Sequence, residues 1–131
     1  MSVEEIFAGQ KLLHLMGAEL TRVAPGEVDI SLRFRDDLAQ QSGALHAGTV
    51  AAIADTACGL AALSLMPEGS GVVSVEFKIN LLAPAIGERF VAKGRVVRAG
   101  RTLSVCTADV IADDERVIAT MLATMMRRSS Q

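Results

Sequence analysis

Residues 47–66 read AGTVAAIADTACGLAALSLM, an apolar run in which Asp55 is the one charged residue. A run of this length is long enough to cross a bilayer. However, it is built from Ala, Gly, Thr and Ser as much as from Leu and Ile, and it lacks the basic or aromatic flanks of a membrane span. We therefore predict a helix that is buried on nearly all sides of a soluble domain and is stopped by MPEGSG at 66–71.

Strand patterns lie on both sides of this helix, because apolar and polar residues alternate there and turn residues separate the segments. The predicted strands cover residues 18–23, 27–35, 73–81, 89–98, 101–112 and 116–126. A first helix is expected over 3–16, and RRSSQ at 127–131 is expected to be a frayed tail. The order predicts one α+β domain over 1–131, with an antiparallel sheet curled around the long helix.

The composition excludes several classes of function. A net charge of −2 gives no electrostatic footprint for nucleic acid, and an aromatic content of 3% without Trp or Tyr offers few surfaces for base stacking. Cys58 and Cys106 are expected to be reduced core thiols. The acidic segment at 1–11 does not have the pattern of a signal peptide. We expect a cytoplasmic protein that binds neither nucleic acid nor membranes.

Asp55 is the residue that does not fit an apolar, buried helix. A buried carboxylate destabilises a fold unless a partner compensates for its lost hydration. One interpretation is structural: Asp55 caps a neighbouring loop or pairs with an arginine. The other is functional: Asp55 is a general base or a nucleophile.

The start of the same helix is suited to bind negative charge. Small residues in GALHAGT at 43–49 let a ligand approach free backbone N–H groups, and the helix dipole favours an oxyanion there, although close packing also explains small residues. Ala47 and Asp55 lie about 12 Å apart along one helix, whereas a base and an oxyanion donor must reach the same reacting centre. An enzyme that uses both features must be at least a dimer with two antiparallel copies of the helix.

In combination and order, four segments resemble the PaaI-like branch of the hot-dog thioesterases (the phenylacetate-degradation type) over nearly the whole chain. The segments are QQSGALHAG at 40–48, AAIADTA at 51–57, VSVEFKINLLAPA at 73–85 and VRAGR at 97–101. The resemblance implies a hot-dog fold, in which an antiparallel sheet wraps around the central helix. It also implies an acyl-CoA thioesterase that needs no metal or organic cofactor and forms at least a homodimer, with a homotetramer favoured over a dimer.

The resemblance also implies roles for individual residues. Asp55 corresponds to the catalytic carboxylate, and the Ala47 N–H polarises the thioester carbonyl. His46 orders the loop and assists the carbonyl or the leaving thiolate, Ser74 helps to position the nucleophilic water, and Gln40 reaches the thioester from the partner subunit. Two residues depart from the pattern: Ala47 stands where the family has Gly, and Gln40 where relatives often have Asn.

Four further residues are candidates for binding CoA: Gly48, Lys78, Arg98 and Arg101. Arginine suits bidentate contacts with phosphate, although surface hairpins carry such charges routinely. A purely structural interpretation also stays open for two of the predicted site residues. His46 can serve to satisfy a buried carbonyl, and strict alternation places Ser74 on the same strand face as Glu76, where solvent would surround it.

Two rival functions remain. The chain could be a hot-dog module that binds acyl-CoA without hydrolysing it, or a dehydratase of the same fold that uses an Asp/His pair at the β-carbon. The position of His46 at the helix start favours the thioesterase over the dehydratase. The acyl pocket is expected to be formed by residues such as Ile53, Leu60, Met66 and Phe77, which do not define the acyl group.

Overall fold

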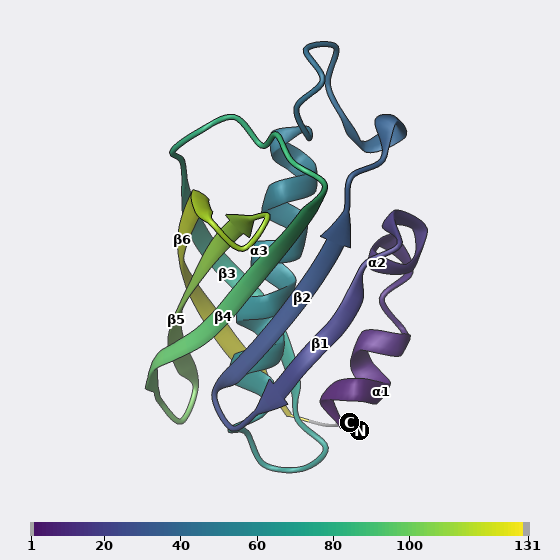
Figure 1. Cartoon of the computed structure of the whole chain (residues 1–131). Helices are drawn as coiled ribbons and strands as arrows, with labels where there is room; N and C mark the ends of the chain where they lie inside the picture. The colour runs from purple at the N-terminus through teal and green to yellow at the C-terminus, as the bar shows by residue number, and fades with distance from the viewer. Residues whose placement is uncertain (1, 130–131) are drawn as a thin grey trace.

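The computed structural model describes residues 2–129. Its six strands form one antiparallel sheet in the order β1-β2-β4-β5-β6-β3, which curls around the long helix α3 (Figure 1). The strands are β1 (Glu19–Ala24), β2 (Glu27–Arg33), β3 (Gly71–Leu81), β4 (Arg89–Ala99), β5 (Leu103–Ala112) and β6 (Arg116–Arg128), and the helices are α1 (Val3–Ala8), α2 (Lys11–Met16), the 3-10 helix η1 (Asp36–Leu38) and α3 (Ala47–Leu63). The predicted hot-dog architecture is confirmed.

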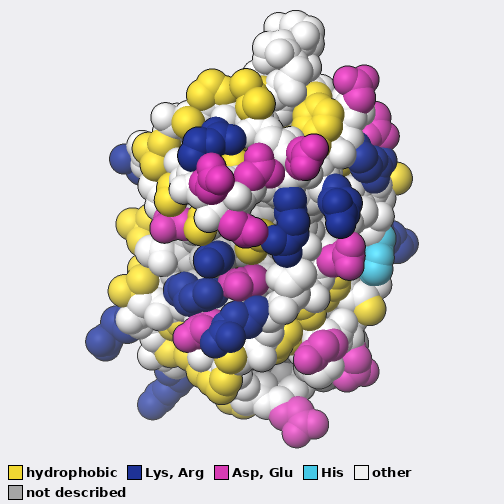
Figure 2. Space-filling view, viewed as in Figure 1, with side chains coloured by type: hydrophobic (Ala, Val, Ile, Leu, Met, Phe, Trp, Pro, Cys, Tyr) yellow, Lys and Arg dark blue, Asp and Glu magenta, His cyan; other side chains and the backbone are white. Residues whose placement is uncertain are grey.

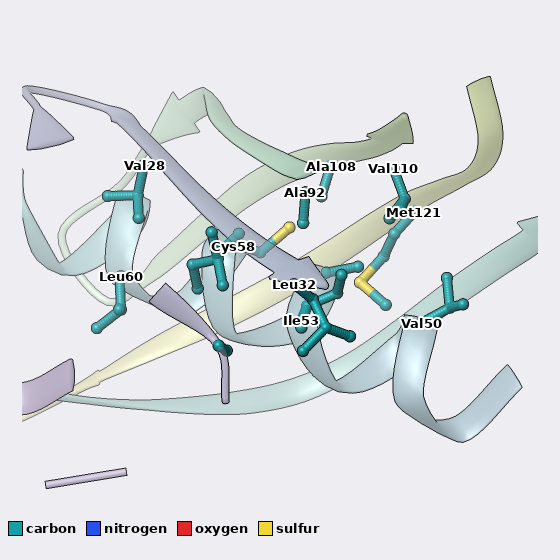
Figure 3. Packing of buried hydrophobic residues seen from close by; sticks show 14 of the residues in the cluster. Val28, Leu32, Val50, Ile53, Cys58, Leu60, Ala92, Ala108, Val110 and Met121 are labelled. Carbon is teal, nitrogen blue, oxygen red and sulfur yellow. The ribbon is translucent and has the colours of Figure 1, made fainter. Parts of the chain in front are cut away.

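The helix α3 is covered by the concave face of the sheet. Figure 3 shows Val50, Ile53 and Cys58 of α3 among inward-facing side chains of the strands. Burial of this apolar surface is the main stabilising contribution to the fold. At Gly94 of β4 the helix approaches so closely that a Cβ atom would collide with the carbonyl of Ala57. A residue larger than glycine there would push α3 off the sheet.

The first helical segment differs from its prediction. A single helix was expected over 3–16, but the chain forms α1 and α2, with Gly9 as the C-cap of the first and Gln10 as the N-cap of the second. Glycine disfavours a helix interior, and the break lets both short helices contact the body of the domain. Val3 and Phe7 are buried from α1, and Leu13 from α2.

The C-terminal tail also differs in part. Arg127 and Arg128 belong to β6 instead of a frayed tail, because they pair with the beginning of β3. Residues 130–131 of the predicted tail lie outside the described residues. Cys58 and Cys106 are free and buried, as predicted, and burial raises the pKa of both thiols, that of Cys106 to about 11. Both thiols therefore stay protonated at neutral pH.

Over β2 and β4, acidic and basic side chains are interspersed (Figure 2), and they include the ion pair between Asp29 and Arg95 at 2.7 Å. Among the described residues, no helix has the length and apolar character that spanning a membrane requires.

Asp113, in the β5–β6 turn, is expected to give the fold an acid-sensitive contact. One of its carboxylate oxygens accepts the N–H groups of Arg89 and Glu88 at 3.0 and 2.9 Å, and these two bonds lower the pKa of Asp113. A carboxylate with a lowered folded-state pKa stabilises the fold above its unfolded pKa of about 3.9, and this stabilisation is lost as the pH falls through the folded value.

Asp113→Ala should therefore lower the Tm at pH 7, and its difference from the unmodified protein should shrink at pH 3. The matched control is Asp114→Ala, because both aspartates have a positive φ, of 53° and 59°. Asp114 makes an exposed ion pair with Arg89 at 3.5 Å, and such pairs contribute little to stability. Asp114→Ala should therefore lower the Tm less than Asp113→Ala does. Thermal melts at the two pH values decide this, and a Tm difference for Asp113→Ala that does not depend on pH would contradict it.

Candidate active site

Asp55 and Ser74 form a hydrogen-bonded pair between α3 and β3. Asp55 is half-buried on a stripe of α3 that the sheet does not cover, and the Ser74 hydroxyl donates to its Oδ1 at 2.6 Å. Within the described residues, Oδ2 accepts no hydrogen bond. The contacts do not support the structural interpretation of Asp55, because among the described residues its side chain bonds to Ser74 and neither caps a loop nor meets an arginine. One carboxylate oxygen is held in place while the other remains available to a ligand or water.

A β-bulge explains how Ser74 reaches the helix. The β3–β6 register shifts between Ser74 and Glu76, so Ser74 is opposite the buried Met125 while Glu76 is opposite Thr124. Residues directly opposite each other in antiparallel strands point to the same face. Strict alternation is therefore wrong in placing Ser74 on the face of Glu76, because the extra residue, Val75, separates them; Ser74 is nevertheless exposed in the single chain, as the alternative interpretation expects.

The Asp55–Ser74 pair lies in a pocket of about 290 Å³ that runs along the C-terminal half of α3. One wall is the beginning of β3, and the other is the elbow between α1 and α2. The lining residues are Ile6, Gln10, Asp55, Thr56, Gly59, Leu60, Leu63, Gly71, Val72, Val73, Ser74 and Met125. Asp55 is the one charged residue among them, and the polar Gln10, Thr56 and Ser74 lie among apolar residues, so the pocket suits an uncharged ligand whose reactive group lies at the carboxylate.

The N-terminus of α3 presents one free backbone N–H. His46 is the N-cap: its Nδ1 accepts the Gly48 N–H at 2.8 Å, and its carbonyl accepts the N–H groups of Thr49 and Val50. Within residues 2–129, the Ala47 N–H is bonded to no acceptor. Ala47 thus offers a donor at the positive end of the helix dipole, where developing negative charge is stabilised.

The contacts of the His46 ring are those of a helix cap and not those of a side chain that satisfies a buried carbonyl. Because Nδ1 accepts a hydrogen bond, the proton of the neutral ring lies on Nε2. A Cβ atom at Gly48 would approach His46 Nδ1 to 3.0 Å, which is tighter than usual contacts, so glycine at this position preserves the cap. The predicted role of His46 in ordering the loop is consistent with this cap.

Gln40 lies with Ala47 in a second pocket, of about 510 Å³. This pocket is lined by the loop before α3, which projects at the top of Figure 1, by Leu81 at the end of β3, and by the segment that follows, including Leu82. It contains neither Asp55 nor Ser74. Within one subunit, the five predicted catalytic residues therefore lie in three separate places. Asp55 lies with Ser74, Ala47 lies with Gln40, and His46 lines a third depression beside the start of α3.

The candidate residues for CoA binding are spread over the chain. Gly48 is at the second position of α3, and Lys78 is exposed on the outer face of β3, opposite Leu122, so it points away from Ser74. Arg98 and Arg101 are exposed at the β4–β5 hairpin, at the lower left of Figure 1, where basic side chains protrude in Figure 2. Neither arginine is ion-paired within the described residues.

The predicted acyl-pocket residues are mostly elsewhere. Leu60 lines the pocket of Asp55, but Ile53 is fully buried in the core, Met66 lines a different depression, and Phe77 is exposed on β3. The pocket instead uses Ile6 and Gln10, among others, which the sequence could not place because α1 and α2 contact α3 only in the folded chain. Thr56 and Gly59 could have been found, since they neighbour Asp55 on one helix.

Within residues 2–129, no group of three or more His, Cys, Asp or Glu side chains could hold a metal ion. That hydrolysis needs no metal or organic cofactor stays a prediction.

Comparison with known proteins agrees with this geometry. The family model of the thioesterase superfamily matches residues 42–119, a span that contains α3 and Asp55. A solved structure of a thioesterase family protein from Silicibacter pomeroyi superposes with a TM-score of 0.94 at 46% identity, covering 98% of this chain and 96% of that one.

Two further proteins are similar. Human acyl-coenzyme A thioesterase 13 is 30% identical over 92 residues, which are 70% of this chain and 65% of that protein. The E. coli PaaI protein of the phenylacetic acid degradation operon has a TM-score of 0.91 over 99% of this chain and 93% of that one, and at 16% identity it shows the fold alone. From the family match and the fold together, this chain belongs to the thioesterase superfamily and is a thioester hydrolase with a hot-dog fold.

Proposed function

We propose that the protein hydrolyses acyl-CoA to a free acid and CoA, at a site that two subunits complete. Asp55 and Ser74 of one subunit would act on a thioester whose carbonyl oxygen is bound by the Ala47 N–H of the partner subunit. The observation that supports this most is the separation of the two halves: the carboxylate pair and the free helix N–H line different pockets of one chain. The name of human acyl-coenzyme A thioesterase 13 supports the CoA thioester as the substrate class.

Strand β3 offers a means of bringing the two halves together. It is an edge strand of 11 residues, with Val75, Phe77 and Leu81 exposed, and long apolar edges of this kind pair readily with another strand. Its beginning lines the pocket of Asp55, and its end lines the pocket of Ala47. An antiparallel pairing of two β3 strands about a two-fold axis would lay the beginning of one strand beside the end of the other. Each Asp55 pocket then adjoins the Ala47 pocket of the other copy.

The chemistry follows from the free groups. Ser74 holds Oδ1 of Asp55, so Oδ2 accepts a proton from a water molecule as that water attacks the thioester carbon. The negative charge that develops on the carbonyl oxygen is stabilised by the Ala47 N–H of the partner subunit. The C–S bond then breaks, and CoA leaves as a thiolate. Gln40 of the partner subunit lies in the same pocket as Ala47 and can contact the thioester.

The phosphates of CoA would bind to exposed arginines. Arg98 and Arg101 are the candidates, because their guanidinium groups are exposed and are not paired with carboxylates among the described residues. Lys78 and Gly48 also remain candidates for contacts with CoA, from the surface of the second subunit. We propose a homodimer as the minimal active unit, and the homotetramer remains the favoured larger assembly.

The central test is release of CoA, followed with a thiol reagent, across short, long and aromatic acyl-CoAs. Hydrolysis of at least one class is expected. A protein that binds acyl-CoA in calorimetry but releases no CoA from any of them would instead be the non-catalytic binding module. Conversion of enoyl-CoA to hydroxyacyl-CoA in place of hydrolysis would indicate the dehydratase.

Ser74→Ala should lower kcat about tenfold or more with little change in KM, because a hydrogen bond to a charged group contributes about 1.5–3 kcal/mol and this one orients the reacting carboxylate. Ser74→Thr keeps the hydroxyl and should retain most of the activity. Steady-state kinetics on the best acyl-CoA measure both. If Ser74→Ala raises KM alone, the serine contacts substrate and does not position Asp55.

A further inference from the structure

Gly59 lies one helical turn beyond Asp55, on the same side of α3, and lines the same pocket. Residues four apart in a helix are neighbours on one face, separated by about 6 Å along the axis. A side chain at this position would therefore project into the space next to the reacting carboxylate.

The fold itself does not require glycine at position 59. A Cβ atom there would meet only Met125 Sδ, at an ordinary contact distance of 3.8 Å, and Gly59 has no positive φ. Gly94 differs, since a Cβ there collides with Ala57, and Gly48 differs because it faces His46. Glycine in the middle of a helix is less stable than alanine. The chain thus carries a destabilising residue where a methyl group would fit, which points to the pocket as the reason.

The chemistry of this pocket suits an acyl group better than the polar arm of CoA. Apart from Asp55 and the polar Gln10, Thr56 and Ser74, the pocket is lined by glycine and by apolar residues such as Leu60 and Met125, and among the described residues no lysine or arginine lines it. A pantetheine arm carries amides and ends in phosphates, which need hydrogen-bond partners and cations. A hydrocarbon chain needs neither.

We propose that Gly59 is a specificity-determining residue that keeps the acyl pocket open, so that acyl chains long enough to pass one turn beyond Asp55 are accepted. The inference rests on the proposed acyl-CoA hydrolysis and names the part of the substrate that this pocket holds. On this proposal the protein is a thioesterase for medium or longer apolar acyl groups, and the absence of a side chain at Gly59 leaves the space that the acyl chain occupies.

The test compares acetyl-CoA, whose acyl group ends before Gly59, with octanoyl-CoA, whose chain extends past it. Gly59→Leu should lower kcat/KM for octanoyl-CoA by roughly tenfold or more while changing that for acetyl-CoA little, because a misfit of one methylene in an apolar pocket costs about 10-fold to 200-fold. Gly59→Ala should shift the same ratio in the same direction by a smaller factor.

Stability gives a second readout that a structural role for Gly59 would not produce. Gly59→Ala should raise the Tm by about 3 °C, since alanine favours the helix and the space for its methyl group exists. The matched control is Gly9→Ala, a glycine outside the pocket whose Cβ would also meet only ordinary contacts, the nearest at 3.5 Å from the Ile6 carbonyl. It should leave the ratio of octanoyl-CoA to acetyl-CoA activity unchanged.

Three outcomes overturn the inference: no change in the ratio for Gly59→Leu, an equal loss for both substrates, or a lowered Tm for Gly59→Ala. An equal loss would mean that the pocket holds the pantetheine arm or that the substitution disturbs Asp55. If the unmodified protein hydrolyses neither thioester, the proposed function fails instead. Calorimetry then tests separately whether this pocket binds the acyl chain, by comparing the Kd of octanoyl-CoA for the unmodified protein and for Gly59→Leu. An unchanged Kd overturns the inference.

Discussion

Replacing Asp55 by Asn is expected to lower kcat for acyl-CoA hydrolysis by about 10²-fold to 10⁴-fold, which is the usual contribution of a positioned general base. The folded structure should persist, because the amide oxygen of Asn can still accept the hydrogen bond that Ser74 donates at 2.6 Å. The amide cannot take a proton from water, however. Activity should therefore fall far more than stability does.

Asp109 provides a matched control for this substitution. Its Oδ1 accepts the Thr120 hydroxyl at 2.8 Å, so it has the same kind of partner as Asp55, but it lies exposed on the outer face of the sheet. Asp109→Asn should retain full CoA release. Activity of Asp55→Asn near that of Asp109→Asn, with equal Tm values, would refute the assigned role of Asp55.

Labelled water separates a general base from a nucleophile. If Asp55 attacks the thioester itself, an acyl-aspartyl anhydride forms, and H₂¹⁸O that attacks the aspartyl carbonyl carbon of this anhydride places ¹⁸O in the Asp55 carboxylate. If Asp55 only activates water, the label enters the free acid alone. Asp55→Ala supports the same distinction, because it removes the amide that can still orient water in Asp55→Asn.

The sequence predicts best what depends on local pattern. The long helix around Asp55 and the six strands follow from periodicity and turn residues, and the structure places their limits within a few residues of those expected. The resemblance adds roles for individual residues, and the structure places Asp55 in contact with Ser74 and Ala47 in one pocket with Gln40. The helix, the strands and the motifs are each encoded in a short segment, whereas the contact between Asp55 and Ser74 also depends on a distant strand.

What the sequence misses depends on contacts between distant segments. The bulge at Val75 is defined by the partner strand β6, and without it strict alternation turns Ser74 away from the helix. Gln10 enters the pocket because α1 and α2 separate and cover the open side of α3, which no pattern within 3–16 reveals. Gly59 is visible in the sequence, but its significance appears only when the space for a Cβ atom is known.

Ala47→Pro is expected to reduce hydrolysis by about 10²-fold to 10³-fold, the usual effect of losing one oxyanion donor. Proline removes the N–H of residue 47 without a structural penalty, for three reasons. The N–H makes no internal hydrogen bond, the first helical position favours proline, and His46 already has the extended conformation (φ −60°, ψ 141°) that proline demands of its predecessor. Ala47→Gly keeps the N–H and should retain activity.

Mixing the two inactive proteins tests whether the site is shared between subunits. In a dimer of one Asp55→Asn chain and one Ala47→Pro chain, one site carries both defects, while the other combines an intact Asp55 with an intact Ala47. Random reassociation of equal amounts should therefore restore about one quarter of the unmodified activity if each site draws on two chains. If each chain held its own complete site, every site in the mixture would carry one defect and no activity would return. Absence of recovery, with exchange of subunits verified by mass, would sink the two-subunit site.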